Sequence, residues 1–514
     1  MLQANIEQNG KTKVDNIFVI DAHSHLGQDV DGAAMMNPLA PSGTFDFWGN
    51  VQGKIQADWE KTGEQSFETT INGKRSTIHW SFRPFPFTDK LYHAIEKLGR
   101  KHSDLREKAK FYSFIDQGVC FPFQDTFRDK RPEALYRSSN MNIARFTTRF
   151  PFSMKLIGYC RVDPSEKEKA VNEVKHSREV LGLRGLKLHP RSEGWVDEVT
   201  KDVPIPVLLE AAKHSMPIIF DTRGKRTIVE IGQLVQSTRN IIKTKYPDLL
   251  PHFKVIIAHF AQGNIGDHDV YNTIVQPNVY GDLSMLHGEG AANFFEDFQR
   301  WFKTNNKIQV DGRDWSEYLL FATDYPYFGD VHAEKLLIEI INKHFFDAGG
   351  TIQDTKNILG LNQIKLLPEY NLAIDNGMVK NKPSTMVSNP AYEENKISAY
   401  DISIQALANL IVSNKIDINK FCLQFEGTFN EFNRDILLMI TNTNTKEELN
   451  LYFKNIVEDR INLVGTIGNN LTWNKFGYKF FNPNDRKLFS RLFTRTYLAT
   501  SVDQAIENIS AIIS

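Results

Sequence analysis

Eight short apolar segments, rich in Val, Ile, Leu, Phe and Tyr, recur between residues 16 and 326, and segments with helical periodicity separate them. This alternation predicts parallel strands joined by right-handed crossover helices. Eight such units within about 350 residues favour a (β/α)8 TIM barrel over an open sheet. Two of the predicted helices cover residues 165–180 and 205–215. The predicted strands cover residues 16–25, 110–119, 154–164, 182–190, 217–224, 253–260, 278–286 and 318–326.

The connection after the first predicted strand, residues 27–110, is far longer than an ordinary barrel loop. Within it, Asn72-Gly73 separates two β-prone runs in residues 66–80, which is the signature of a tight β-hairpin. Loops that follow barrel strands lie at the C-terminal mouth of the barrel. We therefore expect the insertion to form a lid or a pocket wall, the alternative being a solvent-exposed hairpin with no role there.

The strand–helix alternation ends near residue 370. Residues 379–396 are polar and contain prolines, as in a linker, whereas residues 398–414 have helical periodicity. We therefore divide the chain into a barrel domain, residues 1–370, and a linker with a mainly helical C-terminal region, residues 371–514. The C-terminal region is expected to dock on the barrel or to form a contact in a homo-oligomer.

The composition argues against several classes of partner. The chain has 61 Lys and Arg residues against 62 Asp and Glu residues, which gives no electrostatic reason to bind nucleic acid or an anionic membrane. No apolar run approaches the ~20 residues of a membrane span, and residues 1–16 lack the apolar core of a signal peptide. Three widely separated cysteines suit a reducing compartment. We predict a cytoplasmic protein that acts on a small molecule.

Residues capable of metal chemistry cluster at the C-terminal ends of the predicted strands. Because side chains alternate along a strand, Asp21, His23 and His25 are expected to share one face. The ends of parallel barrel strands meet at one mouth, so histidines and carboxylates from distant segments would converge there. Histidine and carboxylate are the ligands that Zn²⁺ prefers, with Fe²⁺ or Mn²⁺ as alternatives. The residues at the later strand ends are Lys187, His189, Asp221, His259 and Asp324.

The motifs that carry these residues resemble the amidohydrolase superfamily. "IDAHSHLG", "GLKLHP", "IIAHF", "VYGDLSM" and "FATDYP" follow one another in the order typical of the family, and "NILGLNQIKLL" is similar to the helix that closes its domain. The resemblance is greatest to the amidohydrolase-related branch of TIM-barrel metal-dependent hydrolases, which also contains non-oxidative decarboxylases. It covers residues 16–370, except for the long insertion.

The resemblance implies specific roles for four of these residues. His23 and His25 correspond to the metal-binding His-x-His of strand 1. His259 corresponds to the strand-6 histidine, which binds metal or polarises the substrate. Asp324 corresponds to the strand-8 aspartate, which binds metal and shuttles the proton of the attacking water. Such a role suits a carboxylate, since a neighbouring cation keeps it ionised while it can still accept a proton.

Strands 5 and 4 leave questions open. In "PIIFDTRG", Asp221 stands where the family has a histidine ligand, so it is a candidate metal ligand, substrate-binding group or partner of Arg223. Lys187 stands where binuclear relatives carry a carboxylated lysine that bridges two metals. His189 is expected to bind metal or to face the substrate. We favour one metal, because the missing histidine is a usual ligand of the second, and the alternative for Lys187 is a buried ion pair with Asp21 or Asp324.

Three further residues near the mouth, Arg191, Arg223 and His287, are candidates for substrate binding. An arginine there would bind a substrate carboxylate in a forked geometry. The resulting hypothesis is a metal-dependent hydrolase that attacks a C–N or C–O bond of a small polar substrate. The alternatives are a metal-dependent non-oxidative decarboxylase on the same barrel and a degenerate barrel that binds a ligand without catalysis.

Overall fold

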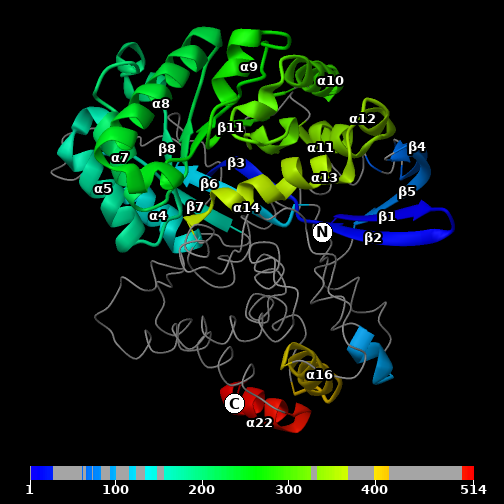
Figure 1. Cartoon of the computed structure of the whole chain (residues 1–514). Helices are drawn as coiled ribbons and strands as arrows, with labels where there is room; N and C mark the ends of the chain where they lie inside the picture. The colour runs from blue at the N-terminus through cyan, green and yellow to red at the C-terminus, as the bar shows by residue number, and fades with distance from the viewer. Residues whose placement is uncertain are drawn as a thin grey trace.

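The central feature of the chain is a parallel eight-stranded sheet, seen in the computed structural model in the order β12-β11-β10-β9-β8-β7-β6-β3 (Figure 1). Every predicted barrel strand is found, which confirms the (β/α)8 class. The strands are β3 (Ile20–Leu26), β6 (Gln117–Pro122), β7 (Leu156–Arg161), β8 (Gly185–Leu188), β9 (Ile218–Phe220), β10 (Val255–Ile257), β11 (Val279–Asp282) and β12 (Leu319–Leu320). The structure describes residues 2–26, 59, 61, 65–71, 73–82, 93–99, 115–122, 134–147, 156–286, 288–325, 333–368, 399–415 and 501–513.

Backbone hydrogen bonds between β3 and the segment that follows β12 close the sheet into a barrel. Ala22 N donates to Phe321 O over 3.0 Å, and His25 N donates to Tyr325 O over 2.8 Å. Closure leaves no free sheet edge at this seam. It also brings the first and last motifs of the barrel, some 300 residues apart in the sequence, next to each other.

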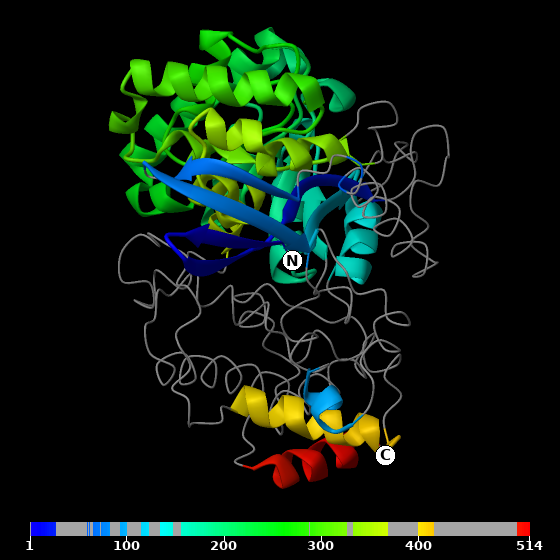
Figure 2. The same ribbon diagram turned by 90° about the vertical axis from the view of Figure 1, so that its right-hand side faces the viewer.

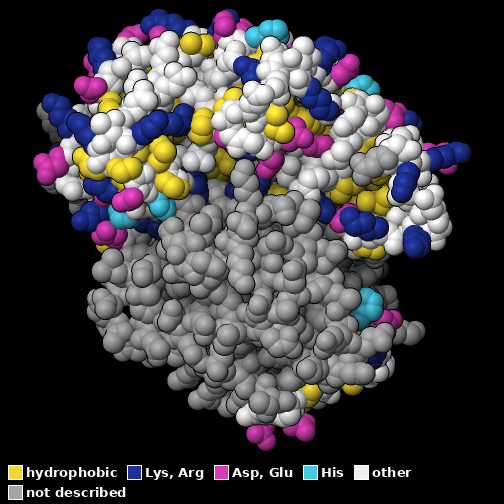
Figure 3. Space-filling view, in the orientation of Figure 1, with side chains coloured by type: hydrophobic (Ala, Val, Ile, Leu, Met, Phe, Trp, Pro, Cys, Tyr) yellow, Lys and Arg dark blue, Asp and Glu magenta, His cyan; other side chains and the backbone are white. Residues whose placement is uncertain are grey.

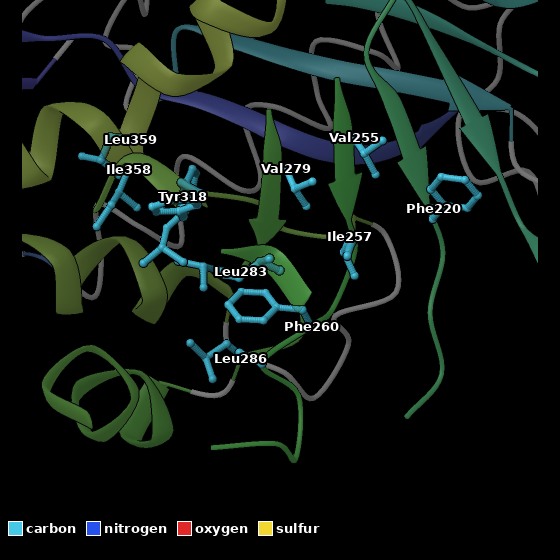
Figure 4. Packing of buried hydrophobic residues seen from close by; sticks show 14 of the residues in the cluster. Phe220, Val255, Ile257, Phe260, Val279, Leu283, Leu286, Tyr318, Ile358 and Leu359 are labelled. Carbon is cyan, nitrogen blue, oxygen red and sulfur yellow. The ribbon is translucent and has the colours of Figure 1, made fainter. Parts of the chain in front are cut away.

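Alternate residues of the barrel strands enter two separate hydrophobic clusters. One set, which includes Val119, Ile157, Ile219 and Ile256, belongs to the cluster inside the barrel. The other set packs outward against the surrounding helices, as Figure 4 shows for side chains of β9, β10 and β11. Because side chains alternate along each strand, one set of residues fills the barrel interior and the other forms an apolar outer shell. The interior can hold polar groups at its mouth.

The helices that surround and close the barrel include the two predicted from the sequence, now found as α5 and α7. In chain order they are α4 (Arg137–Thr147), α5 (Glu168–Glu179), α6 (Pro190–Glu193), α7 (Ile205–Lys213), α8 (Lys225–Lys245), α9 (His268–Ile274), α10 (Gly288–Thr304), α11 (Ala333–Ile341), α12 (Lys343–Asp347), α13 (Ile352–Lys356) and α14 (Asn362–Leu366). Short 3₁₀ turns lie between several of them, and a π-helical turn, Asn357–Leu361, joins α13 to α14.

Helix α14 closes the N-terminal end of the barrel. Its Ile364 and Leu366 belong to the interior cluster. Lys254, which immediately precedes β10, donates from Nζ to the carbonyl oxygens of Lys365 and Leu366 over 2.8 and 3.3 Å. With this end filled by apolar side chains, the C-terminal mouth is where the barrel can place polar chemistry.

A second, antiparallel sheet has the order β2-β1-β5-β4 and lies beside the barrel (Figures 1 and 2). The predicted hairpin is confirmed as β4 (Ser66–Ile71) and β5 (Lys74–Phe82). The sequence analysis did not predict the first hairpin, β1 (Leu2–Gln8) and β2 (Lys11–Ile17), whose Asn9-Gly10 turn has φ values of 52° and 72°. Such positive φ angles are typical of a type I′ turn, so Asn-Gly between two β-prone runs was the signal available.

The hairpin of the insertion packs on the side of the barrel. Phe67 and Trp80 contact the ring of Phe346 in α12, and Thr69 donates to Asp347 over 3.1 Å. Much of residues 27–110, including 27–58, lies outside the described residues. The role of the insertion as a lid or pocket wall therefore stays a prediction, as does the domain division at residue 370.

The C-terminal region is described over two helices, α16 (Ala399–Val412) and α22 (Val502–Ile513), which contact each other (Figure 2). Its docking and any homo-oligomer stay predictions. None of the described helices combines the length and hydrophobicity needed to cross a bilayer. Over the described part of the face in Figure 3, acidic and basic side chains are interspersed, in line with the balanced charge.

The strand β3 is irregular where the first site residues lie. Its register against β6 shifts between Asp21 and Ser24. Ile20 and Ala22 belong to the interior cluster, whereas Asp21 accepts hydrogen bonds from Thr323 N and Oγ1 at the barrel seam. The expectation that Asp21 shares a face with the two histidines is therefore wrong, because a β-bulge interrupts the alternation.

A substitution at Gly360 tests how closely the π-helical turn packs against the residues that precede β3. A Cβ atom at Gly360 would lie 2.4 Å from the backbone oxygen of Phe18, which cannot move as a side chain can. Gly360→Ala is expected to lower the free energy of unfolding by roughly 1–3 kcal/mol. Gly290→Ala in α10, where the nearest atom is 3.5 Å away, is the matched control and should not destabilise the protein. Urea unfolding measures both, and equal effects would contradict the close approach.

Candidate metal centre

The C-terminal mouth of the barrel gathers seven polar side chains that are almost completely buried. Six of them were predicted from the sequence, and Asp282 was not. Each lies in a barrel strand or within four residues after its C-terminal end. They are His23, His25, Lys187, Asp221, His259, Asp282 and Asp324. Since buried charges are stable only when paired, the contacts among these groups determine what the site can do.

His23 directs its two ring nitrogens at two carboxylates. Its Nδ1 lies 2.7 Å from Asp282 Oδ2, and its Nε2 lies 3.2 Å from Asp324 Oδ1. Because an ionised carboxylate only accepts hydrogen bonds, Nδ1–H of His23 donates to Asp282. Burial, together with the charge of Lys187, lowers the pKa of His23 and so disfavours the doubly protonated ring. The neutral ring then turns the lone pair of Nε2 toward an Asp324 oxygen, and a cation between these two acceptor atoms would stabilise them.

Asp324 lies between the two histidines of β3. Its Oδ1 is 3.1 Å from His25 Nε2 and 3.2 Å from His23 Nε2. Burial raises the pKa of Asp324, but the neighbouring histidines, His259 first, outweigh burial and hold that pKa below its ordinary range. Burial lowers the pKa of His25 to about 3. The site therefore contains an ionised carboxylate next to neutral imidazole.

His259 and Asp324 both adopt backbone conformations that are uncommon for residues with a side chain. Their φ angles are 55° and 56°, in the left-handed region. His259 N donates to Asp282 Oδ1 over 3.1 Å, and Asp324 N donates to His23 O over 2.9 Å. Strain of this kind occurs often at functional sites, and here it sets the direction of two side chains that face the mouth.

The donor set fits a divalent cation. Ligand atoms of His23, His259 and Asp324 lie within 4.8 Å of one another. Two ligand atoms bound to one tetrahedral Zn²⁺ are about 3.4 Å apart, close to the 3.2 Å between His23 Nε2 and Asp324 Oδ1. Imidazole nitrogen and carboxylate oxygen suit Zn²⁺, Fe²⁺ and Mn²⁺ alike. The structure thus brings together three of the predicted metal residues, and His25 lies against the third.

Asp221 is the hub of a second group of contacts. Its Oδ2 lies 3.4 Å from both Lys187 Nζ and His259 Nε2. Its Oδ1 lies 3.4 Å from His189 Nε2 and 3.5 Å from Arg223 Nε. Burial raises the pKa of Asp221, but Lys187 and His189 outweigh it and hold the pKa well below its ordinary value. The expected pairing with Arg223 is found, and the metal-ligand role of Asp221 stays a prediction.

Lys187 forms the buried ion pair that was one of its predicted alternatives. The partner, however, is Asp221 rather than either carboxylate expected from the sequence. Nζ also lies 3.3 Å from His23 Nε2, and burial lowers the pKa of the amine. Lys187, on β8, therefore contacts both groups of residues at the mouth. Its carboxylation stays a prediction.

His189 has partners for both ring nitrogens. Nδ1 accepts from Ser192 N over 3.2 Å and so caps α6, which leaves Nε2–H to point at Asp221. Its backbone N donates to Glu193 Oε2 over 3.1 Å. In this arrangement Nε2 of His189 is a donor to a carboxylate, and its role as a metal ligand stays a prediction.

The three candidate substrate-binding residues differ in where they lie. Arg223 pairs with Asp221 and is 41% exposed, so it lies at the rim of the site. Arg191 lies on α6 and is exposed. His287 lies outside the described residues. Their roles in substrate binding stay predictions.

Sequence reasoning missed four residues that organise the mouth. Asp282 is the last residue of β11 and Ser284 follows the strand; their signal was present in "VYGDLSM", which served only as part of a family pattern. Arg161 and Glu193 form a buried ion pair over 2.7 Å behind His189. A charged residue at the end of each barrel strand would have been the general signal for Asp282 and Arg161.

Comparisons with known proteins give remote similarities. No protein-family model and no curated protein sequence matches the chain. Similar solved structures include a 5-carboxyvanillate decarboxylase from Novosphingobium aromaticivorans complexed with manganese, at 13% identity over 68% of this chain and 96% of that one, with a TM-score of 0.37.

Two other similar structures are named for different activities. A 4-oxalomesaconate hydratase from Rhodopseudomonas palustris has 14% identity, 70% and 98% coverage and a TM-score of 0.35. An amidohydrolase from Mycobacterium avium subsp. paratuberculosis has 13% identity, 68% and 98% coverage and a TM-score of 0.33. The neighbours are barrels of the amidohydrolase superfamily, which the motifs resemble. Likenesses this remote carry no argument of their own, and the fold rests on the strand pairing.

Asp21 is predicted to stabilise the seam that holds the site together. It accepts from His23 N over 3.1 Å and from Thr323 N over 2.9 Å. Asp21→Ala would leave both buried donors without an acceptor and should lower the free energy of unfolding by roughly 2–5 kcal/mol. Asp21→Asn keeps a carbonyl oxygen for both donors and should lose less than half as much. Equal losses in urea unfolding would contradict this account.

Proposed function

We propose that the chain is a metal-dependent hydrolase that activates water at the barrel mouth for attack on a C–N or C–O bond of a small polar substrate. The observation that carries the proposal is the approach of His23 Nε2 to Asp324 Oδ1 at 3.2 Å, with Asp282 holding the other nitrogen of the ring. Two buried acceptor atoms at this distance favour a cation between them.

His23, His259 and Asp324 would hold the metal, with His25 beside Asp324. A bound divalent ion polarises a carbonyl oxygen and lowers the pKa of water toward ~7. Asp324 then serves as the proton acceptor, because its carboxylate is ionised and lies next to the proposed metal position, where water is activated. The hydrogen bond to His25 Nε2 over 3.1 Å keeps Oδ1 oriented while a proton moves to the carboxylate.

The second group of contacts is suited to substrate orientation. Lys187 and His189 present N–H groups around Asp221, and Arg223 adds a further N–H group at the solvent-exposed rim. N–H donors arranged in this way would bind the oxygen atoms of a carbonyl or carboxylate group. This supports a polar, oxygen-rich substrate.

Metal content is the first test. Protein purified in the presence of Zn²⁺, Fe²⁺ or Mn²⁺ and then desalted should retain about one ion per chain, as a mononuclear site holds. His23→Ala should lose most of this metal, whereas His79→Ala on β5 should keep it. Atomic emission spectrometry measures the ratio. Two ions per chain together with a carbamate on Lys187 by mass spectrometry would favour the binuclear alternative, and no retained metal would contradict the proposal.

Asp324→Asn tests the proton acceptor. The variant keeps the shape of the side chain but cannot accept the proton, so turnover should fall by at least about 100-fold while the circular dichroism spectrum stays unchanged. Activity is followed with a panel of small amides, esters and lactones. Unchanged turnover in the variant would exclude Asp324 from this role.

The same panel separates the alternatives. Release of CO2 from aromatic acids without any hydrolysis would favour a decarboxylase, and it would contradict the hydrolase proposal. Metal-loaded protein that binds panel members but transforms none of them would favour a non-catalytic barrel.

A further inference from the structure

Asp282 and Ser284, at the end of β11, are linked to both histidines of the candidate metal centre. Asp282 Oδ2 accepts the Nδ1–H of His23 at 2.7 Å. Ser284 Oγ lies 2.7 Å from Nδ1 of His259 and also forms a short contact with Asp282 Oδ1. All four side chains are at most 2% exposed, so water does not compete for these bonds.

The direction of each hydrogen bond follows from the number of protons available. Asp282 Oδ1 also accepts from the backbone N of His259 and of Ser284, at 3.1 and 3.0 Å, so this carboxylate acts only as an acceptor. The single hydroxyl proton of Ser284 therefore points to Asp282. Nδ1 of His259 must then carry a proton and donate it to Ser284 Oγ. The chain of donors runs from His259 through Ser284 to Asp282, and a separate donor arrives from His23.

We propose that Asp282 and Ser284 form one positioning unit that keeps Nδ1 of both His23 and His259 protonated, so that both rings turn Nε2 toward Asp324 and Asp221. A single carboxylate holds His23 directly and His259 through the hydroxyl. The unit touches neither substrate nor metal, and it acts by fixing ring orientation and tautomer. As an account of metal binding the inference rests on the proposed function, but the tautomers themselves do not depend on it.

The geometry around the unit explains why one residue cannot replace the pair. The backbone N of His259, in its left-handed conformation, donates to the same Oδ1 that accepts from Ser284. Asp282 thus fixes the main chain of His259 and, through Ser284, its ring. Loss of the hydroxyl should free the ring of His259 alone, whereas loss of the carboxylate should free both rings. This difference between the two variants is specific to the proposed connectivity.

Histidine ¹⁵N NMR of the full-length, metal-free protein with selectively labelled histidine tests the connectivity. Ser284→Ala should change the Nδ1 signal of His259 and leave that of His23 in place, and Asp282→Asn should change both. Signals are assigned from His23→Gln and His259→Gln. Ser316→Ala removes an equally buried hydroxyl that contacts Asn357 outside the site, so it should change neither signal. Unchanged signals of both histidines in Ser284→Ala would overturn the proposal.

Zn²⁺ affinity by chelator competition supplies a second readout. Asp282→Asn should weaken binding about 10–100-fold, Ser284→Ala should weaken it less, and Ser316→Ala should not change it. If the wild-type protein binds no Zn²⁺ although the NMR pattern is as expected, the proposed function fails and the positioning unit stands. If the wild type binds Zn²⁺ and Ser284→Ala binds it equally well with both signals unchanged, the unit fails and the proposed function stands.

Discussion

The mouth of this barrel is organised by the burial of carboxylates. Asp221, Asp282 and Asp324 are each at most 3% exposed, and an isolated buried carboxylate is strongly unfavourable. Each is therefore surrounded by nitrogen groups: Asp282 by His23 and backbone N–H groups, Asp221 by lysine, histidine and arginine, and Asp324 by histidines. Asp324 differs in its partners, because burial lowers the pKa values of His23 and His25, whose nitrogens lie closest to it, and only the pKa of His259 is raised among these three histidines. A divalent cation is the group that would complete its surroundings.

The fold makes this arrangement possible by closing on itself. The β3–β12 seam places the His-x-His motif beside Asp324, while α14 and the interior cluster fill the opposite end with apolar side chains. The bulge in β3 and the left-handed conformations of His259 and Asp324 then direct individual side chains. Hydrogen bonds to Asp21, Asp282 and the carbonyl of His23 hold those conformations, so backbone and side-chain networks depend on each other.

Much of the barrel could be predicted from the sequence, because eight apolar runs with helices between them follow periodic rules. His23, His259 and Asp324 could be placed at one mouth for the same reason: strand ends converge in a parallel barrel. The partners of Asp221 could not be predicted, since they depend on which strands are adjacent and on side-chain rotamers. Asp21 was misplaced because a bulge leaves no trace in hydrophobic periodicity. Asp282 could be recognised only as a carboxylate at a strand end, and the first hairpin only from Asn9-Gly10. Each of these signals is too common by itself to predict the feature.

The proposed chemistry depends on a divalent cation between His23 Nε2 and Asp324. Anomalous diffraction at the absorption edge of the metal, from crystals of metal-supplemented full-length protein, can locate this ion. An anomalous peak is expected at about 2.0–2.2 Å from both His23 Nε2 and an Asp324 oxygen. A mouth without an anomalous peak in metal-saturated crystals, or a peak bound by other residues, would contradict the proposed metal site.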